Sequence, residues 1–110
     1  MSLEKCFIKA VEFTGILEDI NAESAILSRA ERDERFKEVM GREHLERLKK
    51  ELPSDVEELK RALEESAECM ERDRFERVKD LVEELGELIS QGNYLDIGPK
   101  VSQIYKELGV

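Results

Sequence analysis

Paired glutamates are the residues of this 110-residue chain whose spacing could support chemistry. Glu65 and Glu68 lie three positions apart, and so do Glu84 and Glu87. Residues three apart share a face of an α-helix, so each pair could offer two carboxylates to one Mg²⁺ ion. A magnesium-dependent nucleotide hydrolase that uses these four helical carboxylates is therefore one hypothesis for the function.

Other features of the sequence argue against such an enzyme. All-α nucleotide pyrophosphatases have a similar pattern, but their second pair ends in Asp where this chain has Glu87. Glu65 and Glu68 lie opposite the apolar stripe of Leu63 on their predicted helix, whereas a site inside a bundle needs inward-facing carboxylates. Such pairs also arise easily in a chain with 27 acidic residues. We therefore expect no catalytic residue, no metal site, no cofactor and no enzymatic activity.

Histidine and cysteine offer no recognisable site either. His44 is the single histidine, and Gly41 stands where a helical di-iron motif needs Glu. Cys6 and Cys69 are isolated in the sequence and lack the close spacing of metal ligands. We expect His44 to be an ordinary surface or boundary residue, and both cysteines to be small buried apolar residues in a reducing compartment.

The charge of the chain limits its partners. The net charge is −9, so the protein should repel phosphate backbones and anionic lipid. Two clusters of basic residues, interleaved with acidic ones, keep weak nucleic-acid binding as a second alternative, although no aromatic platform accompanies them. They are Arg47 with Lys49 and Lys50, and Arg72, Arg74, Arg77 and Lys79.

Hydropathy and composition suggest where the protein works. No apolar run approaches the ~18 residues of a membrane span, and no basic segment followed by a long apolar stretch begins the chain. We therefore expect a cytoplasmic protein with no membrane partner. Glu, Lys and Arg are abundant while Asn and Gln are rare, a bias typical of hyperthermophile proteins, which favours a thermophilic source.

Apolar periodicity predicts a first helix over residues 3–20 and a second over residues 22–52 with Asn21 as its N-cap. The apolar phase of the second changes near Gly41, where we expect either a kink or two halves that serve different neighbours. Pro53 should end this stretch, and Ser54 should begin the next helix with a capping box that Glu57 completes.

The second half of the chain should hold two or three further helices. The apolar stripe that starts at Val56 is interrupted at Asp73, which predicts either a new helix capped there or one long helix with a stutter. Gly92 should end that helix. After a turn-like connector over residues 93–98, a last short helix should begin near Asp96 and close at Gly109.

These elements predict an all-α fold, a compact bundle of four to five helices that forms a single domain over residues 1–110. The connector over residues 93–98 should close one end of the bundle with Tyr94 and Leu95. Six apolar residues should be core: Leu17, Phe36, Leu59, Leu63, Val78 and Leu85.

The first helix carries the signal on which our functional expectation depends. Its apolar residues cover a broad arc, and Ile8 and Ile16 lie outside that arc. If these two side chains are exposed in the monomer, they should contact a protein partner, most simply in a homodimer. We therefore expect a non-enzymatic protein–protein interaction or assembly module, and no small-molecule ligand.

Overall fold

A computed structural model describes residues 2–109 of the chain and contains α-helices and 3₁₀-helices but no strand in that range. The prediction of an all-α bundle of four to five helices is confirmed. The five α-helices are α1 (Leu3–Arg32), α2 (Glu34–Met40), α3 (Arg42–Glu65), α4 (Arg72–Ser90) and α5 (Ile97–Leu108). Two short 3₁₀-helices, η1 (Ala67–Cys69) and η2 (Tyr94–Asp96), precede α4 and α5.

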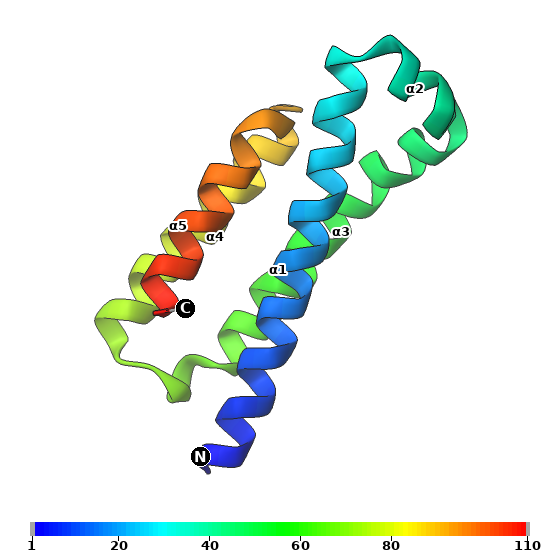
Figure 1. Cartoon of the computed structure of the whole chain (residues 1–110). Coiled ribbons are helices and arrows are strands. Elements are labelled where there is room, and N and C mark those ends of the chain that lie inside the picture. Colours follow the sequence, from blue (N-terminus) through cyan, green and yellow to red (C-terminus); the bar gives the residue numbers. More distant parts are fainter. Residues whose placement is uncertain (1, 110) are drawn as a thin grey trace.

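The bundle consists of two helical hairpins (Figure 1). Helix α1 packs mainly along α3, with α2 joining them at one end, and α4 packs mainly along α5. The second hairpin lies against the first through α3–α4 and α1–α5 contacts. The molecule measures 48 × 21 × 21 Å, because 30 residues of α1 at ~1.5 Å each set its length. No helix of the described range is long and apolar enough to cross a membrane.

The predicted break after Ile20 is wrong, because α1 runs without interruption to Arg32. Buried residues continue the same face past Asn21, first Ser24 and then Leu27. The Ser24 hydroxyl donates a hydrogen bond to the backbone carbonyl of Asn21, so this polar residue is satisfied inside the core. Burial of the continuous face outweighs the local capping preference of Asn21.

Pro53 and Ser54 likewise lie inside α3 instead of at a helix boundary. Proline removes one backbone hydrogen bond and crowds the preceding turn, which usually ends or kinks a helix. In α3 the proline ring is exposed, while Leu52 and Val56 on either side of it are buried on one face. Packing against α1 and α4 holds the helix together across the defect.

Gly41 marks a true break in the second predicted stretch. It separates α2 from α3 with φ 84° and ψ 144°, a conformation that residues with a side chain rarely adopt. Its N–H donates to the carbonyl of Lys37 at 3.1 Å. At the other end of α2, Asp33 accepts a hydrogen bond from the N–H of Phe36. The chain therefore turns around through a seven-residue helix with a cap at each end.

The later boundaries are closer to expectation. The predicted interruption exists, but α3 ends at Glu65 and α4 begins at Arg72, so Asp73 lies in the first turn of α4 instead of capping it. Helix α4 ends two residues before Gly92. Helix α5 closes at Gly109, which is left-handed with φ 80°, as predicted.

Five of the six predicted core residues are buried, and Phe36 is the exception. Phe36 belongs to α2, which covers one end of the hairpin and has no buried residue. One side of its ring packs against the core, and the guanidinium of Arg29 lies 4.4 Å from the ring centroid. A helix at the end of a bundle has too few neighbours to enclose an aromatic ring.

The expectation that both cysteines are small buried apolar residues is wrong, because Cys6 and Cys69 are half buried and form a disulfide. The pair is 63 residues apart in sequence, yet the Cα atoms are 5.5 Å apart. Helices α1 and α3 run antiparallel, so the end of α3 lies beside the start of α1. Spacing in the sequence could not reveal a contact that the tertiary fold creates.

Candidate functional site

The most prominent surface feature is an apolar face on the first turns of α1. Leu3, Phe7 and Val11 are spaced four residues apart, and Ile8 lies beside them. Their exposed fractions are 89%, 70%, 54% and 48%. We call these four residues the α1 face.

The length of α1 explains this exposure. Phe13 is the first buried residue along the helix, followed by Leu17 and Ile20. At 100° per residue, Phe7 points roughly 110° away from the average direction of these three core residues. The first turns of α1 therefore carry apolar side chains that the helices of this chain leave uncovered.

Gly15 continues the four-residue spacing that runs through Leu3, Phe7 and Val11. A Cβ atom built on Gly15 would have no heavy atom within 4 Å, so the fold does not need glycine at this position. Glycine in an exposed helix interior costs roughly 1 kcal/mol relative to alanine. Gly15 thus leaves a flat surface at the end of the α1 face, where another backbone could approach closely.

Charged side chains attach the same segment to the end of α3. Lys9 Nζ lies 2.6 Å from the Glu65 carboxylate and 3.6 Å from that of Glu12. The hydrogen bond to Glu65 is the main cause that raises the pKa of Lys9, and the same bond lowers the pKa of Glu65. Both side chains are partly exposed, so this ion pair contributes little to stability.

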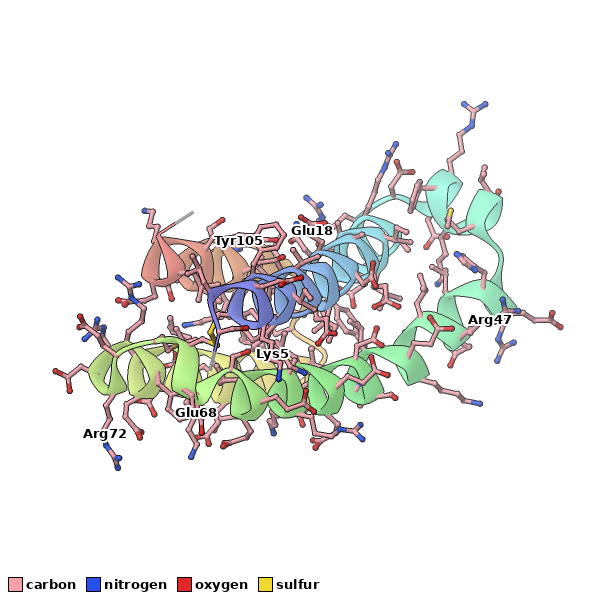
Figure 2. All side chains as sticks on the ribbon, turned by 90° about the horizontal axis from the view of Figure 1, so that it is seen from below. Lys5, Glu18, Arg47, Glu68, Arg72 and Tyr105 are labelled. Carbon is pink, nitrogen blue, oxygen red and sulfur yellow. A yellow bond between two sulfur atoms is a disulfide. The ribbon has the colours of Figure 1, made fainter. Side chains whose placement is uncertain are left out.

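The disulfide lies next to the α1 face (Figure 2). Cys6 precedes Phe7 directly, and the sulfur–sulfur bond joins α1 to the chain that follows α3. A cavity of about 220 Å³ adjoins both cysteines. Phe13, Met70 and Leu108 contribute to its largely apolar lining. The half-buried disulfide can therefore be reached from this cavity.

The two predicted interaction residues lie in different environments. Ile8 is half exposed and belongs to the α1 face. Ile16 is partly buried and packs against the core. The broad apolar arc predicted for the first helix includes Leu3, Phe7 and Val11, and all three are exposed. The excessive breadth of that arc was the available signal, because one helix cannot bury so wide a surface against two neighbours.

The four glutamates of the hydrolase hypothesis do not converge. Glu65 pairs with Lys9, and Glu84 accepts a hydrogen bond of 3.1 Å from Lys100. Glu68 and Glu87 are exposed. Within residues 2–109, no group of three or more histidine, cysteine, aspartate or glutamate side chains is arranged to hold a metal ion.

A different set of carboxylates interacts between α1 and α3. Burial is the main cause that raises the pKa of Glu23 to about 9, and the nearby carboxylates of Asp55 and Glu51 add to it. Its Oε1 atom is buried without a hydrogen-bond partner. Glu23 is therefore protonated and uncharged at neutral pH, which permits three acidic residues to share this junction.

The remaining candidates from the sequence are dispersed. Figure 2 shows Arg47 and Arg72, one from each basic cluster, near opposite ends of the molecule. Arg77 pairs with Glu107 at 2.8 Å. His44 is half buried on α3.

The connector over residues 93–98 contains η2 and is held by local and core contacts. The Asn93 side chain donates a hydrogen bond of 2.8 Å to Asp96. Tyr94 packs against the core, as expected of a residue that closes one end of the bundle. The prediction that Leu95 closes this end with it is wrong, because Leu95 is 59% exposed.

A search against protein-family models, curated proteins and solved structures found no match to the chain.

Proposed function

We propose that this protein is a non-enzymatic assembly module that forms a homodimer through the α1 face. The observation that supports the proposal is the contiguous exposure of Leu3, Phe7, Ile8 and Val11 on one rigid helix. Exposed apolar patches of this kind mark interaction surfaces in monomeric proteins. A second copy is the simplest partner, since a two-fold axis brings the same surface of each subunit together.

Side-chain chemistry favours an antiparallel pairing of the two α1 helices. In that register Phe7 lies against Val11 of the second copy, and Leu3 lies over the open surface at Gly15. The same contacts repeat on the other side of the axis, so the pairing is complementary in shape.

The size of the α1 face sets the expected affinity. Four exposed apolar side chains present on the order of 500 Å². Two copies would bury on the order of 1,000 Å² in total, near the lower limit of specific interfaces. We therefore expect a dimer with a dissociation constant in the micromolar range, formed and released readily.

The expected location and source fit the disulfide. We propose that the protein works in the cytoplasm of a thermophile, on the basis of its composition. Cytosolic disulfides are rare in mesophiles, but intracellular proteins of hyperthermophiles are often rich in them. The Cys6–Cys69 bond is compatible with both proposals.

The first test is sedimentation velocity of the wild-type protein and of Phe7→Glu, from about 1 μM to about 1 mM. We expect a wild-type dimer that grows with concentration and a Phe7→Glu variant that stays monomeric, because a buried carboxylate would lack a partner. Ile8→Glu should also weaken the dimer. Helical content should stay unchanged by circular dichroism.

Val39→Glu is the matched control, since Val39 is 76% exposed on α2, away from the α1 face. It introduces the same charge and should leave the dimer intact. A wild-type protein that stays monomeric at the highest concentration contradicts the proposal. So does equal loss of the dimer in Phe7→Glu and Val39→Glu.

A further inference from the structure

We propose that the Cys6–Cys69 disulfide controls this assembly. In the oxidised protein the disulfide keeps the first turns of α1, which carry the α1 face, in their helical conformation, and the protein dimerises. Reduction allows these turns to fray and weakens the dimer. The inference rests on the proposed function, because it concerns the regulation of the same surface. Its starting point is the position of Cys6, between Leu3 and Phe7 in the first turns of α1.

Few contacts attach these first turns to the rest of the molecule. Among the described residues, no side chain before Phe13 is buried. The disulfide and the ion pair between Lys9 and Glu65 join residues 2–12 to other elements. Segments with little buried surface open locally at low free-energy cost.

The ion pair cannot replace the disulfide as an attachment. The Lys9 and Glu65 side chains are 28% and 55% exposed, so water and salt screen their attraction. The disulfide is covalent and independent of salt, so it provides most of the restraint on the α1 face.

Local helix stability does not hold the segment either. Ser2 accepts a hydrogen bond from the N–H of Lys5 at 3.2 Å, which satisfies one donor of the first turn. Short helical segments without tertiary contacts are marginal in water. After reduction, residues 3–12 should fray, and a frayed face must be ordered again before it can pair with a second copy.

The redox step is ordinary thiol–disulfide exchange with a small dithiol as reductant. A thiolate of the dithiol attacks one sulfur of the pair through the cavity beside it, which breaks the sulfur–sulfur bond and forms a mixed disulfide. The second thiol of the reductant then displaces the remaining protein thiolate. The protein gains two electrons and two protons as two thiols, and the reductant becomes a disulfide.

The experiment compares the full chain in its oxidised form with the same chain in dithiothreitol. Sedimentation velocity gives the dimer dissociation constant, and hydrogen exchange measures the protection of residues 3–12. We expect reduction to weaken the dimer by at least about tenfold, since the frayed segment must be ordered again on binding. Exchange should accelerate in residues 3–12, while the buried helices α3, α4 and α5 stay protected.

The double variant Cys6→Ser with Cys69→Ser serves as the matched control. It should behave like the reduced protein, and dithiothreitol should not change it further. If the variant does not fold, the comparison of the oxidised and reduced wild-type protein still decides the question. Circular dichroism in dithiothreitol establishes that the reduced wild-type chain stays helical.

The outcomes separate this inference from the proposed function. Equal dimer affinity in both redox states overturns the inference and leaves the assembly proposal standing. A monomer in both states overturns the assembly proposal, and with it any control of assembly. Unchanged protection of residues 3–12 after reduction overturns the inference even if the dimer weakens, because the α1 face would then not have been released.

Discussion

Glu23 is the residue whose charge is most altered by the fold. Its pKa is raised to about 9, first by burial and then by the carboxylates of Asp55 and Glu51. The pKa of this carboxyl in an unfolded chain is 4.5, so the folded state keeps a proton that the unfolded state loses. Glu23 therefore destabilises the fold increasingly as the pH rises from about 4.5 to about 9.

We predict that Glu23→Gln stabilises the protein at pH 8. The amide cannot ionise, and its NH₂ group can donate to the neighbouring carboxylates. The gain should be about 1 to 3 kcal/mol, after allowance for the partial exposure of the side chain. Urea unfolding from pH 5 to pH 9 should show the gain growing with pH. Glu64→Gln, on an exposed part of α3, should not change this pH dependence.

Residue types alone indicated part of the candidate site. The excess of apolar residues on the first helix predicted an interaction surface, and Ile8 belongs to the exposed α1 face. The disulfide between Cys6 and Cys69 could not be anticipated, because it depends on how α1 and α3 lie beside each other. The cluster of Glu23 with Asp55 could not be anticipated either, because Asp55 lies on α3, the other helix of the hairpin.

At the scale of helices, the sequence signals were most useful where a glycine adopts positive φ. Gly41, where we expected a kink or a change of neighbours, separates α2 from α3, and Gly109 closes α5 as predicted. The boundaries predicted at Asn21 and Pro53 failed, because buried residues continue the same face on both sides of them. Tertiary burial outweighs a local capping or proline signal when a long face has a partner to pack against.

Gly41 and Gly15 test how far local backbone conformation decides stability, because one needs glycine and the other does not. Gly41→Ala should destabilise the protein by about 1 to 3 kcal/mol, because its φ of 84° strains any residue with a Cβ. Gly15→Ala should stabilise the monomer by up to about 1 kcal/mol, since open space surrounds that position in a helix interior.

Thermal unfolding at low concentration should detect both changes of stability. At high concentration, Gly15→Ala should weaken the proposed dimer, because the added methyl group lies where Leu3 of the second copy packs. Equal stability changes for the two glycine variants would contradict their assignment to opposite roles.

At the scale of the whole molecule, burial falls from the middle of the bundle towards its ends. Leu17 is fully buried where α1 meets its neighbours, whereas Phe36 on α2 is only partly covered. Five of the six predicted core residues belong to the long helices, whose apolar faces are covered by several neighbouring helices. Phe36 was assigned to the core because periodicity reports which face is apolar and not how many neighbours cover it.

This gradient predicts unequal costs for two large-to-small substitutions. Leu17→Ala should lower the free energy of unfolding by about 2 to 5 kcal/mol, because it leaves a cavity between packed helices. Phe36→Ala should cost about 1 to 2 kcal/mol, including its contact with the Arg29 guanidinium. Chemical denaturation of both variants gives the comparison, and a larger loss for Phe36→Ala would contradict the gradient.

The position of the disulfide also decides how the chain responds to mechanical force. When the two ends are pulled apart, tension passes from the start of α1 through the sulfur–sulfur bond to η1. The chain between the two cysteines, which are 63 positions apart, carries no load, so roughly 200 Å of contour length stays folded. The hairpin of α1 and α3 is thus shielded from stretching while the bond is intact, and α4 and α5 give way first.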